Sequence, residues 1–186
     1  ATFAGERVFD SRIIPLDMAI PEGGLPMICV LSDDDTITPD ARDVSHGKRS
    51  LDMLVETMIG TSVEQDGAVV IPETDGGLEI ALDLMSRQVL RAIQNPRNPW
   101  AECFRKLVTC LDAVVSRRAS DATKGMRFAA RQIALSMDTI NEPPFGPVQP
   151  GVWREFLDLV AASPDPELSR LAAVIEAEIT APDLYS

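Results

Sequence analysis

Three consecutive carboxylates, Asp33, Asp34 and Asp35, are the side chains with the most evident potential for chemistry. They follow the apolar run ICVL, which has the composition of a buried strand. Two carboxylates placed two residues apart at the end of such a strand can transfer phosphoryl groups. One attacks phosphorus, the other moves a proton, and a bound Mg²⁺ neutralises the charge. The spacing of Asp33 and Asp35 therefore raises the hypothesis of a magnesium-dependent phosphatase.

The rest of the sequence does not supply the other groups that this chemistry needs. The pattern resembles the first motif of haloacid-dehalogenase-type phosphatases, which also place a Lys and a later acidic pair at the ends of further parallel strands. The lysines of the chain are Lys48, Lys106 and Lys124, and no acidic pair follows a second apolar strand. The next segment is predicted as a strand and not as the helix of a parallel crossover. We therefore predict a solvated acidic loop and keep the phosphatase using Asp33 and Asp35 as an alternative.

Other catalytic or metal-binding patterns are also missing from the sequence. His46 is the one histidine, and Cys29, Cys103 and Cys110 are irregularly spaced, so no zinc site can be assembled. We expect buried, reduced thiols. No serine or cysteine has a nucleophile-elbow or triad context, and the two Gly-Gly pairs lack the spacing of phosphate-binding loops. We therefore predict a protein that is not an enzyme, without catalytic residues, cofactor or metal.

Two features are better suited to binding another protein. The last predicted strand pair of this acidic chain carries a cluster of basic residues, namely Arg117, Arg118, Arg127 and Arg131. A solvated strand face that discourages edge-to-edge aggregation is the simpler interpretation, but we favour a partner contact. Trp153 begins an amphipathic segment, where it either packs in the core or docks on a neighbouring subunit. The predicted partner interface consists of Asp33, Asp34, Asp35, Arg117, Arg118, Arg127 and Trp153.

Hydrophobic periodicity locates the elements that would carry these residues. Residues 49–59 alternate strictly between two faces, which is the period of a strand, and the shorter run 27–31 is apolar throughout. We predict that these two strands are antiparallel neighbours joined by a long loop at 32–47. Apolar residues recur at helical spacing in four further segments. These predicted helices are residues 78–94, 100–111, 152–162 and 166–179.

The remaining elements complete an α+β fold. Residues 7–14 are predicted as a first short strand, and residues 113–119 and 124–140 as a terminal antiparallel pair. The order β-β-β-α-α-β-β, followed by two helices, predicts a mostly antiparallel sheet with helices packed on one face. A Pro-rich break, NEPPFGPVQPG, separates a predicted α+β domain, residues 1–142, from a linker and C-terminal helical extension, residues 143–186.

Charge and hydropathy argue against two classes of partner. The 186-residue chain has 29 acidic and 17 basic side chains and a formal net charge of −12, so phosphate backbones are repelled overall. This argues against a nucleic-acid binder but not against a protein past which DNA slides without adhering. No apolar run of about 18 residues is present, which predicts no membrane span, and the first residues do not resemble a signal peptide.

Four stretches, spread over roughly residues 5–140, follow a recognisable order. They are AGERVFDSRIIPLD, LPMICVLSDDDT, KRSLDMLVETMIG with the helix GLEIALDLMSRQVLRAI, and the hairpin AVVSRRASDATKGMRFAARQIALSMDTI. In this order and pattern the chain resembles the tail terminator (minor tail protein U-like) family of long-tailed bacteriophages. There the second stretch commonly has Leu-Pro or Phe-Pro, an apolar strand and a polar or acidic loop. The two C-terminal helices depart from the shorter family members.

The resemblance implies a structural virion protein. Its subunits would form a ring, typically a hexamer, that caps the completed tail tube, ends polymerisation of the tail tube protein and joins the tail to the head connector and neck proteins. It implies a location in the virion tail or neck after assembly in the host cytoplasm, with DNA passing through the lumen without specific binding. From their expected exposure, the acidic loop and the last hairpin would contact the tube. Another neck or tail-completion protein of the same fold is the alternative.

Overall fold

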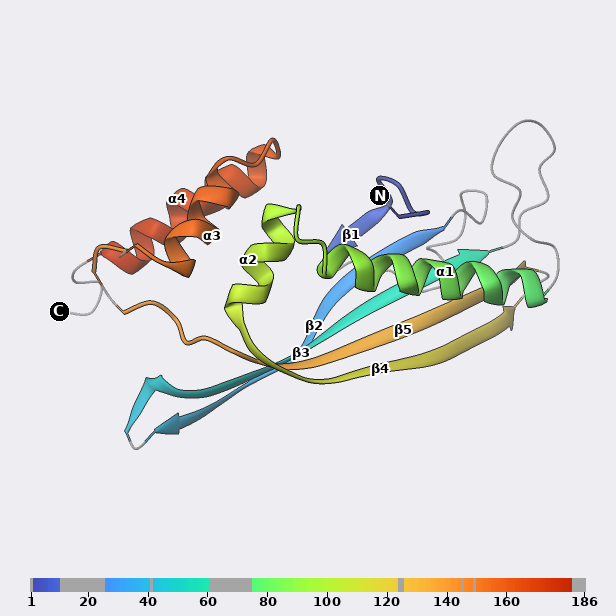
Figure 1. Cartoon of the computed structure of the whole chain (residues 1–186), viewed down its shortest axis with the longest axis horizontal. Helices are drawn as coiled ribbons and strands as arrows, with labels where there is room; N and C mark the ends of the chain where they lie inside the picture. Colours follow the sequence, from blue (N-terminus) through green and yellow to red (C-terminus); the bar gives the residue numbers. More distant parts are fainter. Residues whose placement is uncertain are drawn as a thin grey trace. The chain divides into compact units, whose positions relative to one another are not determined.

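The computed structural model of the chain describes residues 2–10, 26–40, 42–60, 75–123, 126–144, 146–148 and 150–181; the side chains of residues 43–46, 75, 119–123 and 126–128 lie outside this description. Strands and helices follow one another along the chain in the order that the sequence predicts (Figure 1). They are β1 (Val8–Asp10), β2 (Met27–Asp40), β3 (Asp43–Gly60), α1 (Asp75–Ile93), α2 (Pro99–Leu107), β4 (Val108–Thr123), β5 (Met126–Thr139), α3 (Val152–Ala161) and α4 (Pro166–Thr180). The predicted α+β class is confirmed.

The strands form a five-stranded, mostly antiparallel sheet in the order β1-β2-β3-β5-β4 (Figure 1). The short β1 is parallel to β2, with Val8 opposite Ile28 and Asp10 opposite Val30. β2 and β3 are joined through residues 41–42, so they pair as an antiparallel hairpin. β4 and β5 are joined through residues 124–125 and form the second hairpin. The predicted terminal strand pair is therefore confirmed, and β4 is the last strand of the sheet on its side.

The contacts within the chain divide it into two compact units. The first unit contains Ala1–Asp35, Ser50–Ile93 and Leu111–Met137, and the second contains Thr36–Arg49, Gln94–Cys110 and Asp138–Ser186. The separate division into a domain of residues 1–142 and an extension of residues 143–186 stays a prediction. Among the described helices of both units, none is long and apolar enough to cross a membrane.

In the first unit, helix α1 packs its apolar stripe on one face of the sheet (Figure 1). Leu78 and Leu82 of α1 form a cluster with Ile59 of β3 and Ala129 of β5. Met85, one turn further along α1, is fully buried, as is Leu82. These side chains recur at the helical spacing that predicts the element, so the apolar stripe read from the sequence is the face that the helix buries.

The other face of the sheet has a cluster of its own. It joins Met27 and Cys29 of β2 with Met58 of β3 and Ala130 of β5. Successive strand residues point to opposite faces, and the residues next to Met58 and Ala130 pack on α1. This second cluster therefore lies on the face of the sheet away from α1. The strict alternation of β3 thus places apolar side chains on both faces of the sheet.

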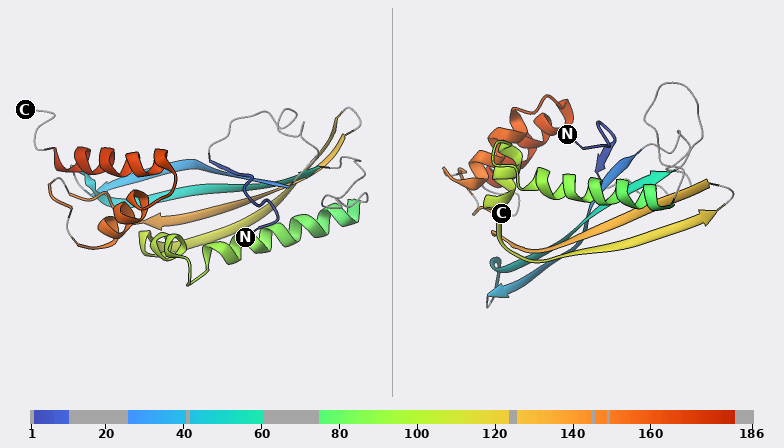
Figure 2. Two further views of the ribbon diagram at one scale, coloured as in Figure 1. Left: turned by 90° about the horizontal axis from the view of Figure 1, so that it is seen from above. Right: turned by 45° about the vertical axis from the view of Figure 1, so that its right-hand side comes forward.

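In the second unit, helix α3 packs against both α2 and α4. Leu157 and Val160 of α3 and Ala172 of α4 are buried, and α3 and α4 lie side by side (Figure 2). Arg154 of α3 also pairs with Glu176 of α4 at 2.6 Å. The two predicted C-terminal helices are therefore confirmed, and their apolar faces bury each other.

Side chains cap the beginnings of α2 and α4. The Asn98 carboxamide oxygen accepts a hydrogen bond from the backbone N–H of Trp100 at 2.9 Å, and Pro99 occupies the first turn. The Asp165 carboxylate accepts from the backbone N–H of Glu167 at 2.8 Å. Each cap satisfies a backbone N–H that has no acceptor inside the helix, and a proline in the first turn already has the helical φ angle.

Two predicted boundaries are wrong. Residues 32–47, predicted as a loop, belong to strands on both sides of a short turn, because β2 continues to Asp40 and β3 begins at Asp43. Hairpin pairing satisfies the backbone whatever the side chains are, so a polar segment without periodicity still forms strand. The second helix ends at Leu107 and not at residue 111, because the backbone of Val108 is already extended and continues into β4.

Replacing a buried residue of α1 should cost far more stability than replacing an exposed one. We expect Leu82→Ala to lower the free energy of unfolding by about 2–5 kcal/mol, because its side chain is fully buried against the sheet. The matched control is Ile80→Ala on the same helix, whose side chain is 70% exposed and which should change stability by about 0.5 kcal/mol or less. Urea unfolding followed by circular dichroism measures both. Equal losses for the two variants would contradict the packing described above.

Candidate functional site

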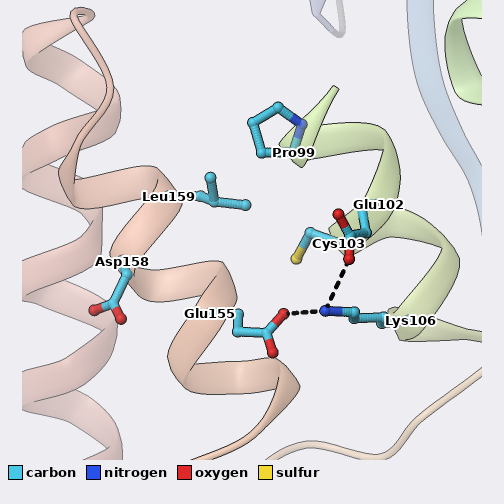
Figure 3. A pocket seen from close by; sticks show the side chains of 7 residues that line it. All are labelled: Pro99, Glu102, Cys103, Lys106, Glu155, Asp158 and Leu159. Atoms are coloured by element: carbon cyan, nitrogen blue, oxygen red, sulfur yellow. Dashed lines mark hydrogen bonds and ion pairs between the residues drawn. The ribbon is translucent and has the colours of Figure 1, made fainter. Parts of the chain in front are cut away.

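A pocket of about 330 Å³ lies between α2 and α3 in the second unit (Figure 3). Its wall combines apolar and charged side chains from the two helices. The lining residues are Pro99, Glu102, Cys103, Lys106, Glu155, Asp158 and Leu159. A thiol, an amine and three carboxylates in one hollow are the groups that nucleophilic or acid–base chemistry uses, so their protonation states decide what the pocket can do.

The charges in this pocket neutralise one another. Lys106 Nζ lies 2.6 Å from a carboxylate oxygen of Glu155 and 3.3 Å from one of Glu102 (Figure 3). The hydrogen bond to Glu155, followed by that to Glu102, raises the pKa of Lys106. Asp158 accepts a hydrogen bond from the guanidinium of Arg154 at 3.0 Å. An amine with a raised pKa stays protonated and is therefore a poor general base or nucleophile.

The thiol in the pocket is equally unsuited to catalysis. Cys103 is 3% exposed, and burial, followed by the nearby charge of Glu155, raises its pKa. A raised pKa keeps the sulfur as a neutral thiol near neutral pH, whereas the thiolate is the nucleophile. The geometry of the pocket supports a salt-bridged contact between α2 and α3 and not covalent catalysis. Among the described residues, no group of histidine, cysteine, aspartate and glutamate side chains could hold a metal ion.

The three aspartates of the predicted acidic loop lie within β2 and are exposed. Asp33, Asp34 and Asp35 are followed by five further strand residues and then by the turn into β3. The phosphatase chemistry instead requires the aspartates at the end of a strand that leads into a helical crossover. The antiparallel hairpin provides no such position, so the geometry gives no support to the nucleophile and acid–base roles of Asp33 and Asp35.

The basic cluster separates across the two faces of the sheet. Arg118 of β4 and Arg131 of β5 both reach Glu79 of α1, at 3.1 Å and 2.6 Å, so both lie on the α1 face. Arg131 also pairs with Asp83, one helical turn further on. Arg117 is adjacent to Arg118 in an extended strand and therefore points to the other face, where it is exposed. The side chain of Arg127 lies outside the described part of the structure.

The acidic partners of these arginines are the residues that sequence reasoning missed. Glu79 and Asp83 are four residues apart on α1, so they occupy one side of the helix. Glu79 Oε2 lies within ion-pair distance of Arg118 Nε but is not aligned for a hydrogen bond. The spacing of the two acids was visible in the sequence, but nothing in the sequence shows which strand they face.

Trp153 is held by contacts inside the second unit. Its indole N–H donates to the backbone carbonyl of Asn141 at 3.0 Å, and its ring meets that of Phe156 edge to face with centroids 5.9 Å apart. The hydrogen bond ties the segment after β5 to α3. Of the two interpretations of Trp153, internal packing is the one with observed contacts, and docking on a neighbouring subunit stays a prediction.

Cys110 and Cys103 should react with an alkylating reagent at different rates, because the first thiol is exposed and the second is buried. The expectation of buried thiols is wrong for Cys110, which is exposed at the start of β4, whereas Cys103 is buried with a raised pKa. Iodoacetamide should therefore label Cys110 first at about pH 7.5. Labelling of Cys103 should rise only at more alkaline pH, because a higher pKa moves thiolate formation upward. Peptide mass mapping after timed labelling measures each site, and urea-unfolded protein is the control in which the difference disappears. Equal rates in the folded protein would contradict the protected thiol.

Removing Arg131 should destabilise the first unit more than removing Arg117. We expect Arg131→Met to lower the free energy of unfolding by about 1–2 kcal/mol, because Glu79 and Asp83 lose a half-buried partner. The control Arg117→Met removes the same charge from an exposed side chain and should change stability by about 0.5 kcal/mol or less. Thermal unfolding of the two variants side by side is the measurement. A larger effect for Arg117 would overturn the assignment of faces.

Comparison with known proteins leaves the function to be argued from the chain itself. No family model matches this sequence, and no curated protein matches it either.

Proposed function

We propose that this chain is a structural virion protein of the tail terminator type. Copies of it form a ring on the completed tail tube of a long-tailed bacteriophage, end polymerisation of the tail tube protein and join the tail to the head connector. The fold is consistent with this role, because the order of strands and helices from β1 to β5 is the order on which the resemblance to this family rests.

The observation that carries the proposal is an exposed arm, residues 32–40 of β2. β2 is buried at Met27 to Cys29, half-buried at the next two residues, and exposed at every residue of the arm. A strand that exposes both of its faces gains little from burial within its own chain. Such an arm is suited to a contact with another protein, and in this proposal its distal part, residues 36–40, contacts the end of the tube.

The backbone of the hairpin that contains the arm is closely paired. A Cβ added to Gly47 of β3 would overlap the carbonyl oxygen of Thr38 in β2. Glycine is the residue without a Cβ, so this position permits the two strands to approach. The hairpin therefore holds the arm as a defined strand, which is the form in which it can present its acidic side chains to a partner.

The acidic balance of the chain suits a ring through which DNA passes. With a net charge of −12, the protein repels phosphate backbones on average. A lumen with that sign lets DNA move through without specific binding, because adhesion to DNA depends on Lys and Arg contacts that displace counterions from the phosphates. In this proposal the protein is located in the virion at the tail or neck. A second neck protein of the same fold would share these properties and differ in its partner.

Light scattering over a dilution series tests the proposal. We expect a closed assembly with a mass near that of about six copies of the 20.2 kDa chain, or a monomer that assembles only when tail tubes are added. Electron microscopy of the same sample should show rings with a central opening. Addition of the chain to growing tail tubes should stop their elongation.

The opposite results would remove the proposal. A monomer at all concentrations that neither binds tube ends nor stops tube growth would contradict a terminator. Rings that bind connector proteins but not tubes would indicate the second neck protein. Hydrolysis of p-nitrophenyl phosphate that requires Mg²⁺ and is lost in Asp33→Asn would instead favour the phosphatase.

A further inference from the structure

The sheet ends on one side at β4, whose exposed side chains include apolar residues, Asp112 and two arginines. Beyond β4 no described strand is paired, so its outward backbone groups have no strand partner in the described part of the chain. Leu111, Val114 and Val115 of β4 are between 41% and 50% exposed. Arg117 follows them on the face away from α1, and no described residue forms an ion pair with it. An edge strand with exposed apolar side chains is a site for pairing with another strand.

On the opposite side of the sheet, no described strand pairs with the outer edge of β2 beyond residue 30, and this stretch is acidic. β1 pairs with β2 only over residues 28–30, so β2 from Leu31 onward has no described strand beyond it. Asp33 and Asp34 follow at once along this edge and are exposed. Arg117 of β4 and Asp33 of β2 thus place opposite charges on the two edges, and both residues belong to the first compact unit.

The complementary charges lie on matching faces of the sheet. Leu31 packs with Cys29 on the face away from α1, and the alternation of β2 places Asp33 on that same face. Arg117 of β4 lies on this face too. Arg118 and Asp34 are the next residues and lie on the α1 face. Each face therefore carries an arginine at one edge and an aspartate at the other.

The strand directions also allow the two edges to pair. From β2 through β3 and β5 to β4 the strands alternate in direction, so β4 runs opposite to β2 (Figure 1). A second copy placed beside β4 with the same orientation presents its β2 antiparallel to β4. Antiparallel pairing gives straight hydrogen bonds, and residues directly opposite each other share one face.

We propose that the β4 edge of one copy pairs with the β2 edge of the next copy, with Arg117 facing Asp33 of that neighbour. This inference rests on the proposed function, because it names the contact through which copies would join. The contact uses two different surfaces, so repetition closes a ring where the rotation permits. Pairing of like edges is disfavoured, because it would bring arginines or aspartates of two copies together.

Disulfide trapping tests this pairing even when the association is brief. In a Cys110→Ser background, the double variant Asp33→Cys with Arg117→Cys is oxidised with diamide and examined by non-reducing electrophoresis. We expect a ladder of covalent multimers, and a much weaker ladder or none from either single variant. Asp33→Cys with Arg87→Cys, which places the second thiol on exposed α1 surface, is the matched control. Thermal unfolding confirms that each variant is folded.

Charge reversal gives an independent measurement of the same contact. Arg117→Glu alone and Asp33→Arg alone should each weaken association by about tenfold or more, measured by light scattering over a dilution series. The two changes together exchange the charges of the two edges and should restore association. Arg87→Glu reverses the same charge away from both edges and should leave association unchanged.

The outcomes separate this inference from the proposed function. Rings on tail tubes without a ladder from the double variant would overturn the edge pairing and leave the terminator role standing. If the double variant gives a ladder of disulfide-linked multimers but the chain does not bind tail tubes, the edge pairing is supported and the terminator role is overturned. A covalent dimer from Arg117→Cys alone would show pairing of two β4 edges and overturn the inference.

Discussion

The packing of α1 on the sheet is the interaction on which the first unit depends. Leu82 and Met85 have no exposed surface, and the hydroxyl of the buried Thr57 beneath them donates to the backbone carbonyl of Arg131 at 3.2 Å. Burying each large side chain contributes about 1.5–3 kcal/mol, whereas an unpaired hydroxyl at this depth would oppose folding. Apolar burial and the satisfied hydroxyl together hold β3 and β5 in register under the helix.

This packing also decides which charged groups remain available. α1 carries Glu79 and Asp83 over the sheet, and they pair with Arg118 and Arg131 on the same face. Arg117, one residue away along an extended strand, faces the other way. One cluster of arginines is thereby divided into a stabilising network and an exposed cation. Arg117 is the arginine most suited to a partner, because no acidic side chain among the described residues pairs with it.

Ion pairs also join the helices of the second unit. Lys106 bridges Glu102 and Glu155, which joins α2 to α3, and Arg154 joins α3 to α4. The charged side chains that line the pocket between α2 and α3 therefore take part in ion pairs. Among the described residues, the exposed arm and the outer edges of β2 and β4 carry side chains that these ion pairs do not involve. We propose that a protein organised in this way acts through association, which is the basis of the proposed ring.

Periodicity in the sequence was sufficient to predict the order of elements, the mostly antiparallel sheet, and the buried stripes of α1 and of the C-terminal helices. These features follow from local spacing, because an apolar face that repeats at 3.6 or 2 residues must be buried. Local spacing did not predict strands at residues 32–40 and 43–47, which are largely polar and form strand because a neighbouring strand pairs with their backbone. Local spacing also did not predict the ion pairs of Glu79, because its partners lie on two other elements, β4 and β5. The tertiary structure decided these points, since backbone pairing and ion pairs depend on which segments meet in space.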